Sequence, residues 1–264
     1  MRTPLIMGII NITKDSFYKG SRKFKPEDIS NEAQKMVQEG VDIIDLGAMS
    51  TRPGAKEVDL KTEIELLEMA CESVRNTHPD VMISIDTYRV EVLQALEKYR
   101  VNMVNDITGG TSEDMYHWAG NQRVPYVCMH MKGTASTMNT LNQYEDMMKE
   151  IMDYFIDRIP KIRKAGVQDI LLDPGFGFAK NADQNFSMLK NLQVFQILEL
   201  PVLVGISRKS MIWRTLGIDP DHALNGTTAL HMIALQKGAK ILRVHDVKAA
   251  RQVISLWQKL ESDI

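Results

Sequence analysis

The sequence has few cysteines, and this scarcity excludes two kinds of framework. Cys71 and Cys128 are the only cysteines among the 264 residues, and they form no CxxC pair. A disulfide scaffold or a structural zinc site needs several cysteines at regular spacing. Both thiols are therefore expected to be free and buried, in a reducing cytosol.

The sequence also lacks long apolar runs and a strong net charge. No segment approaches the roughly 20 apolar residues of a membrane span, and the apolar start of the chain stops at Asn11, too early for a secretory signal. The formal net charge is −2, which gives no general attraction to nucleic acid or to an anionic membrane. We expect a soluble, cytoplasmic protein, in which locally placed cations hold any anionic substrate.

No Pro/Ser-rich linker or low-complexity tract divides the chain, so we expect one domain over residues 1–264. Short runs rich in Ile, Val, Leu and Met predict eight strands, at Leu5–Asn11, Asp42–Gly47, Met82–Asp86, Met103–Asp106, Tyr126–His130, Ile170–Asp173, Val202–Ile206 and Ile241–Val244. Because these runs show no in/out alternation, they are typical of a parallel sheet that is covered on both faces.

Helical periodicity fills the segments between the strands. The clearest stripe runs from Tyr144 to Ile159 with apolar residues at i, i+3, i+4 and i+7. Further helices are predicted at Ser30–Glu39, Leu60–Asn76, Val90–Glu97, Gln184–Phe195, Asp221–Lys237 and Lys248–Leu260. This alternation predicts an α/β fold, either a single (β/α)8 TIM barrel or a doubly wound open sheet.

The ends of the predicted strands favour the barrel. Every strand delivers a hydrogen-bonding or ionisable residue at its C-terminal end: Asn11, Ser50-Thr51-Arg52, Asp86, Asn105-Asp106, His130, Asp173, Ser207-Arg208-Lys209, and Arg243 with His245-Asp246. A single Asp or Asn at such a place commonly caps a helix or makes a turn. Eight sets together, with several cations among them, favour a barrel whose strand ends converge on an active site.

The residue types at these ends indicate the chemistry of the site. Asp86, Asp106, Asp173 and Asn105 suit a flat heterocycle with several N–H donors, and they also suit a metal ion. The cations suit a phosphate or carboxylate ligand. The segment 173–180 lacks the third glycine of GxGxxG and the GK[ST] of a P-loop, so we do not interpret it as a phosphate-binding loop.

Nine motifs, in order along the chain, resemble those of the dihydropteroate synthase family. They are MGIINITKDSF at 7–17, DIIDLG at 42–47, STRPG at 50–54, SIDT at 84–87, NDITGG at 105–110, MHMKGT at 129–134, DPGFGF at 173–178, GISRKS at 205–210 and RVHDV at 243–247. SxDT alone is a weak signal, whereas the ordered series is specific and covers almost the whole chain. The resemblance implies a barrel, a homodimer, a Mg²⁺ ion, and condensation of 6-hydroxymethyl-7,8-dihydropterin diphosphate with 4-aminobenzoate, which releases pyrophosphate.

Carried over position by position, the resemblance assigns residues to each substrate. The pterin ring is implied to contact Asp86, Asn105, Asp173, Lys209, Met131 and Phe178. The diphosphate is implied to contact Asn11, Thr51, Arg52, Arg243 and His245, with Asn11 as the Mg²⁺ ligand. The 4-aminobenzoate pocket is implied to include Phe17, Thr51, Arg52, Pro53, Ser207 and Lys209. The implied catalytic residues are Asp86, Asp173, Lys209 and Asp15.

The family reaction is consistent with these residue types. The diphosphate leaves from a CH2 group on an electron-rich pterin, so the reaction can pass through a carbocation-like state. Asp86 and Asp173 would stabilise the positive charge at the ring, while the cations and Mg²⁺ would stabilise the departing diphosphate. The aniline nitrogen needs little activation, and no Ser-His-Asp or Cys-His constellation is apparent.

Two loops depart from the family pattern. Ile12–Lys25 and Ala48–Asp59 are long and polar, and we expect them to be mobile lids over the site. They differ from the usual family residues at Lys14, Tyr18, Lys19 and Met49. We expect the chemistry to be retained while lid motion and 4-aminobenzoate affinity differ. A further family glycine is Ala179 here, a change that alanine tolerates unless φ is positive.

Two other functions would also be consistent with part of this sequence. A pterin-binding methyltransferase barrel would share the Asp/Asn face, but it would not need the STRP sequence at 50–53 or Ser207-Arg208-Lys209. A non-catalytic pterin-binding paralogue agrees with the altered loops, but it would not require Asn11, Arg243 and His245 to match the synthase pattern.

Overall fold

The computed structural model describes residues 3–12, 25–49, 58–133 and 142–262. Within these residues, eight parallel strands form a closed barrel in which each pairs with the next along the chain and β8 pairs with β1. The strands are β1 (Leu5–Asn11), β2 (Ile43–Gly47), β3 (Met82–Asp86), β4 (Met103–Asp106), β5 (Tyr126–Met129), β6 (Ile170–Asp173), β7 (Val202–Val204) and β8 (Ala239–Val244). The predicted (β/α)8 barrel is confirmed, and the open sheet is excluded because the strands close on themselves.

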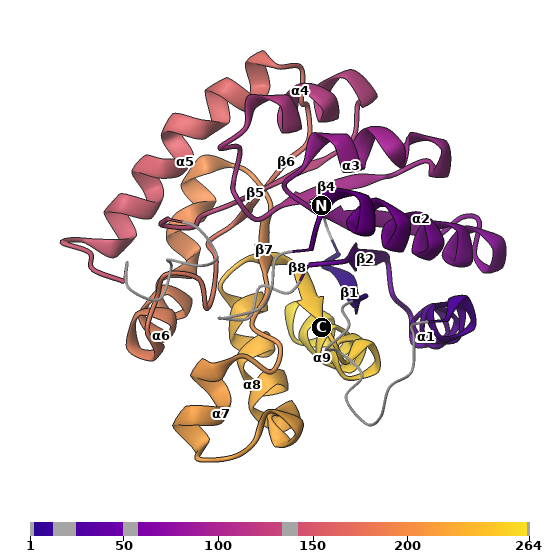
Figure 1. Cartoon of the computed structure of the whole chain (residues 1–264). Coiled ribbons are helices and arrows are strands. Elements are labelled where there is room, and N and C mark those ends of the chain that lie inside the picture. The colour runs from indigo at the N-terminus through magenta and orange to yellow at the C-terminus, as the bar shows by residue number, and fades with distance from the viewer. Residues whose placement is uncertain (1–2, 13–24, 50–57, 134–141, 263–264) are drawn as a thin grey trace.

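Helices surround the strands on all sides (Figure 1). They are α1 (Pro26–Gln38), α2 (Leu60–Thr77), α3 (Val90–Ala95), α4 (Glu113–Gln122), α5 (Met147–Lys164), α6 (Ala182–Lys190), α7 (Ser210–Leu216), α8 (Leu224–Gln236) and α9 (Val247–Glu261). Short 3-10 turns lie at η1 (Glu97–Tyr99), η3 (Leu192–Leu198) and η4 (Pro220–His222). Side chains of the expected kind begin several helices, as where Asp59 accepts from the Thr62 backbone N–H at 3.0 Å.

The predicted strand boundaries agree with the structure to within two residues at every end. The helices agree less well, because no range was predicted for α4 or α7 and the single helix predicted at Gln184–Phe195 is α6 followed by η3. Length alone does not explain this, because α3, which has 6 residues, lies within the helix predicted at Val90–Glu97.

Two apolar layers flank the strands. Seven strands contribute to an inner cluster, with Met7, Ile43, Met103, Val127, Leu171, Leu203 and Ile241. A larger outer core fills the space between strands and helices. Side chains alternate along a strand, so the positions two residues beyond the inner cluster also point into the barrel, nearer its C-terminal end. In β2, β4, β6 and β8 these positions are Asp45, Asn105, Asp173 and Arg243.

Cys71 and Cys128 are free and buried, as predicted. Burial raises the pKa of the Cys71 thiol to about 12 and raises that of Cys128 further, so neither is a reactive thiolate at neutral pH. Among the described residues, no helix is both long and apolar enough to cross a membrane.

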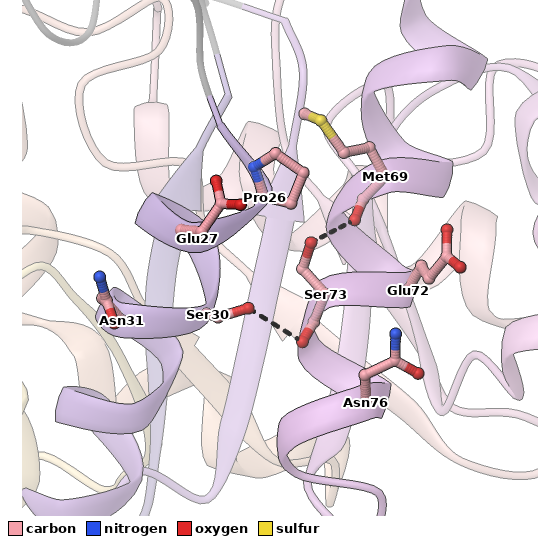
Figure 2. A pocket seen from close by; sticks show the side chains of 8 residues that line it. All are labelled: Pro26, Glu27, Ser30, Asn31, Met69, Glu72, Ser73 and Asn76. Atoms are coloured by element: carbon pink, nitrogen blue, oxygen red, sulfur yellow. Dashed lines mark hydrogen bonds between the residues drawn. The ribbon is translucent and has the colours of Figure 1, made fainter.

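A cavity of about 460 Å³ lies between the outer helices α1 and α2. Figure 2 shows its wall, where the Ser30 hydroxyl donates to the Ser73 carbonyl at 3.3 Å and the Ser73 hydroxyl donates to the Met69 carbonyl at 2.7 Å. Its lining comes from these helices and includes none of the strand-end residues. The chemistry of the barrel is therefore separate from this cavity.

Candidate active site

Arg243, on β8, joins two carboxylates inside the barrel. Its Nε donates to Asp45 Oδ2 at 2.7 Å, and its Nη2 donates to Asp86 Oδ2 at 2.6 Å. Burial alone would lower the pKa of Arg243, but Asp45 and Asp86 raise it above the ordinary value. The guanidinium is therefore a permanent positive charge at the floor of the site.

Asp86 and Asn105 complete this floor. Burial raises the pKa of Asp86 to about 7, with Arg243 opposing the shift and Asp45 adding to it. Asn105, 3% exposed, donates from Nδ2 to Asp45 Oδ2 at 3.0 Å. Because its nitrogen faces Asp45, the amide oxygen of Asn105 faces the other way, as a contact to a donor on a ligand would require.

Asp45 was missed among the predicted site residues. It lies within the 42–47 motif, between Ile44 and Leu46, and pairs in register with Ser84 of β3. A carboxylate in the middle of an otherwise apolar strand is costly unless it is paired, so its position was the signal that could have identified it. Its place two residues before Gly47 puts it on the inward face.

Asp173, Lys209 and Phe178 lie together beyond the end of β6. Asp173 Oδ1 accepts from the Gly175 backbone N–H at 2.8 Å. The Lys209 ammonium donates to the Phe176 carbonyl oxygen and lies 4.8 Å from the centre of the Phe178 ring. Burial lowers the pKa of Lys209 to about 8, and Asp173 opposes that shift. The structure thus brings together three of the residues assigned to the pterin.

Lys180 holds the loop after β6 through contacts to its carbonyl oxygens. It was also missing from the predicted site residues. It is 8% exposed, and its Nζ lies 3.1 Å from each of three atoms: His130 Nδ1, the Gly175 carbonyl oxygen and the Phe178 carbonyl oxygen. Three acceptors match the three N–H groups of an ammonium. Burial and then Lys180 lower the pKa of His130 to about 3, so the imidazole is neutral and accepts at Nδ1. The pair fixes the loop that carries Phe178.

The same loop contains Ala179 with a φ of 49°. This is the condition under which alanine is disfavoured relative to the family glycine, because Cβ then approaches the following carbonyl oxygen. The Tyr144 hydroxyl donates to the Ala179 carbonyl oxygen at 3.0 Å and helps to hold this conformation.

We expect Ala179→Gly to be nearly neutral for stability. Relief of the left-handed strain, about 1–2 kcal/mol, offsets a loss of about 0.8 kcal/mol for a buried methyl group and about 0.5–1 kcal/mol for the flexible unfolded chain. Ala33, fully buried within α1, is the matched control, and Ala33→Gly should cost about 1.5 kcal/mol. Equal losses for the two variants in denaturant unfolding would show that the φ of Ala179 carries no strain.

Ser207, His245 and Asn11 stand at the rim. The buried Ser207 hydroxyl accepts from the backbone N–H of the exposed His245 at 3.2 Å, which ties the end of β7 to the end of β8. A Cβ at Gly47 would lie 3.4 Å from Asn11 Oδ1 and 3.3 Å from Asp86 Cβ. The absence of a side chain at Gly47 therefore leaves room beside the Asn11 amide oxygen and Asp86.

Asp106 does not belong to this group, although the sequence suggested it. Its carboxylate accepts from the Thr108 backbone N–H at 2.8 Å, the Thr108 hydroxyl at 2.7 Å, the Gly110 backbone N–H at 3.0 Å and the Tyr126 hydroxyl. Tyr126 belongs to the outer core. The prediction that Asp106 faces the heterocycle is wrong, because the side chain points to the opposite face of β4 from Asn105.

Some predicted site residues lie outside the described residues, namely Asp15, Phe17, Thr51, Arg52 and Pro53. Most of both expected lids, residues 13–24 and 50–57, lies outside them as well. Met131, which follows β5, is described and is partly buried. The structure thus describes the floor of the site and the walls that follow β5 to β8.

Comparison with known proteins identifies the family of this chain. The family model described as "Pterin binding enzyme" matches residues 7–245. The dihydropteroate synthase of Escherichia coli (strain K12) is 40% identical over 247 residues, which cover 93% of this chain and 87% of that protein. The chain belongs to the dihydropteroate synthase family.

Solved dihydropteroate synthases share the fold along their whole length. The Yersinia pestis enzyme, in complex with a sulfonamide drug, has a TM-score of 0.93 and 35% identity, covering 99% of this chain and 95% of that one. The Thermus thermophilus enzyme, in complex with 4-aminobenzoate, has a TM-score of 0.88 and 35% identity, covering 98% and 95%. The family predicted from the ordered motifs is confirmed.

Proposed function

We propose that this chain condenses 6-hydroxymethyl-7,8-dihydropterin diphosphate with 4-aminobenzoate, giving 7,8-dihydropteroate and pyrophosphate in folate biosynthesis. The observation that carries the proposal is the convergence of Asp86, Asn105, Asp173, Lys209 and Arg243 on one end of a closed barrel. Membership of the family indicates the reaction, and these side chains offer the charges and hydrogen-bonding groups that the reaction requires.

The floor and the β6 wall suit a pterin whose exocyclic CH2 becomes electron-poor. The carboxylates of Asp86 and Asp173 accept hydrogen bonds from ring N–H groups, and their negative charge stabilises a carbocation-like state. The Asn105 amide and the Lys209 ammonium provide directional contacts to the same ring. Because burial weakens solvent screening, these charges act more strongly here than they would at the surface.

The diphosphate would lie toward Asn11, His245 and Arg243. Since the Nε and Nη2 groups of Arg243 are engaged by Asp45 and Asp86, its Nη1 group would be the one that reaches the diphosphate. Arg243 then has two tasks, since it neutralises the floor and also faces the leaving group.

Asn11 is the residue that would hold Mg²⁺. Among the described residues there is no group of three His, Cys, Asp or Glu side chains that could hold a metal ion. The Asn11 amide oxygen, beside which Gly47 has no side chain, nevertheless fits, because Mg²⁺ typically takes one or two protein ligands together with waters and substrate phosphates. When bound, Mg²⁺ would supply stabilisation of the charge that develops on the departing diphosphate.

A homodimer through α7 and α8 is part of the proposal. The two helices contact each other and lie side by side in Figure 1. α8 is apolar without a distinct polar face, and Leu216, Leu224 and Ile233 are exposed on this pair, a pattern that a partner subunit would cover. Sedimentation equilibrium should give twice the chain mass, and a monomer at micromolar concentration would contradict the assignment. The cytoplasmic location stays a prediction.

The decisive experiment incubates purified protein with both substrates and Mg²⁺ and follows dihydropteroate and pyrophosphate. We expect both products in equal amounts, and we expect EDTA to abolish turnover while leaving binding of a pterin without diphosphate unchanged. Pterin binding without turnover would instead identify a non-catalytic paralogue.

We expect affinity for a pterin without diphosphate to rise with pH up to about 7 and then level off. Burial raises the pKa of Asp86 to about 7, and the ionised form is the acceptor that the ring requires, so binding at lower pH must release a proton. Calorimetry in buffers of different ionisation enthalpy measures this release. Asp86→Asn should bind weakly and without that pH slope, and an unchanged slope in the variant would assign the titration to another group.

A further inference from the structure

Arg208 has a backbone conformation that its residue type disfavours. Its φ is 52°, in the left-handed region that non-glycine residues seldom occupy. It stands between Ser207 and Lys209, two residues assigned to substrate binding. Such strain persists only where surrounding contacts impose it.

Four groups of Arg208 provide those contacts. The guanidinium donates to Asp246 in a two-pronged arrangement, from Nε to Oδ2 at 2.8 Å and from Nη2 to Oδ1 at 2.9 Å. Nη1 donates to the carbonyl oxygens of Pro220 at 3.0 Å and Asp221 at 2.7 Å. The backbone N–H donates to the Thr227 hydroxyl at 3.1 Å. The Arg208 side chain is thus committed to the protein and not to a substrate.

The side chain of Asp246 pairs with Arg208 and does not cap α9, the helix that it precedes. It occupies the N-cap position of α9, where an aspartate ordinarily accepts from the backbone of the first turn, but its side chain makes no such bond. Its oxygens are used on Arg208 instead. Because Asp246 pairs with Arg208 and does not make the capping bond that its position favours, we expect the pair to have a role of its own.

We propose that the Arg208–Asp246 pair is a positioning device for the 4-aminobenzoate and diphosphate side of the site. Arg208 fixes the turn between Ser207 and Lys209, and Asp246 directly follows His245. The pair therefore joins the loops after β7 and β8, alongside the bond from the His245 backbone N–H to the Ser207 hydroxyl at 3.2 Å. Neither member touches substrate. This inference rests on the proposed synthase function.

A matched pair exists at the other end of the barrel. Arg251 Nη2 donates to Asp42 Oδ2 at 2.7 Å, and Arg251 Nε donates to the Gly40 carbonyl oxygen at 3.1 Å. The side chains of Arg251 and Asp42 are 33% and 27% exposed, close to the 24% and 25% of Arg208 and Asp246. Because Asp42 precedes β2, this pair has similar chemistry but lies away from the strand ends that form the site.

The test compares Asp246→Asn with Asp42→Asn in the full chain by steady-state kinetics and thermal unfolding. We expect similar falls in unfolding temperature. Asp246→Asn should raise KM for 4-aminobenzoate and lower kcat, together by on the order of 100-fold in kcat/KM, since small misplacements of binding groups have such effects. Asp42→Asn should stay within about twofold of wild type, as a change remote from the site does. Arg208→Lys, which keeps the charge, should lose less than Arg208→Met.

Hydrogen exchange provides a readout that does not need turnover. Asp246→Asn should speed exchange in peptides covering residues 205–211, whereas Asp42→Asn should not. Unchanged exchange there, or equal kinetic losses in the two aspartate variants, would overturn the inference while leaving the proposed function standing. If the wild-type protein makes no dihydropteroate, the proposed function fails, and faster exchange at 205–211 still decides whether the pair holds this turn.

Discussion

Replacing Arg243 with methionine is expected to abolish synthesis and to lower the free energy of unfolding by about 3–5 kcal/mol, as breaking a buried ion pair from one side does. The substitution leaves Asp45 and Asp86 close together without the cation that now donates to both, at 2.7 Å and 2.6 Å. The two carboxylates would then repel each other, and the pKa of Asp86 would rise, so that Asp86 protonates more readily. Turnover assays and urea unfolding measure the two losses.

The loss of stability should depend on pH in a definite direction. Without Arg243 the pKa of Asp86 in the folded protein rises further above its unfolded value, so the folded state binds the proton more tightly than the unfolded chain does. The stability gained from that proton is present below the unfolded pKa and is lost as pH rises through the folded value. The gap between Arg243→Met and wild type should therefore be largest at neutral and higher pH and should shrink toward pH 4.

Two further variants separate charge from packing in this experiment. Adding Asp45→Asn to Arg243→Met removes one stranded carboxylate, so it should restore part of the stability but none of the activity. Arg75→Met is the control, because Arg75 donates to the Tyr99 and Val81 carbonyl oxygens and to Asn102 Oδ1. It should destabilise the protein without the same pH dependence. An Arg243→Met variant as stable as wild type at pH 8 would contradict this account of the floor.

The architecture could be predicted because apolar runs and helical stripes are local signals. The boundaries of β1, β3, β4 and β6 were predicted without error, since each ends where polar side chains begin. Closure of the barrel is not local, and it was inferred from the polar residues at all eight strand ends. No range was predicted for α4 or α7, although α3, which is shorter than both, lies within a predicted helix.

The site was predicted less completely, in part because residue types do not give the direction of a side chain. Asn105 and Asp106 are adjacent, so one faces the barrel interior and the other the outer core, and their residue types alone do not tell which. Asp45 lies within β2, two residues before its end at Gly47, so the pattern of polar residues at strand ends did not include it. Lys180 acts through the loop carbonyls and His130, and the φ of Ala179 depends on that loop; neither follows from a motif.

Asp173→Asn is expected to weaken binding of the pterin diphosphate by about 10- to 100-fold, the range of a lost hydrogen bond to a charged group. Asparagine can still accept the Gly175 N–H, now held by Asp173 Oδ1 at 2.8 Å. The other carboxylate oxygen becomes an NH2 donor, which would face the N–H donors of the ring. The variant should therefore still fold, but its NH2 group would repel the N–H donors of the ring. Calorimetry with the pterin diphosphate measures the loss of affinity.

The same variant should shift the pH dependence of turnover through Lys209. Burial lowers the pKa of Lys209 to about 8, and Asp173 is the first group that opposes this. Removing the charge of Asp173 should lower that pKa further, so activity that depends on the ammonium should be lost at a lower pH than in wild type. Asp106→Asn is the control, because its carboxylate is used within the turn after β4. That variant should lose stability while keeping pterin affinity, and equal affinity losses at the two positions would show that Asp173 acts through folding rather than through the ring.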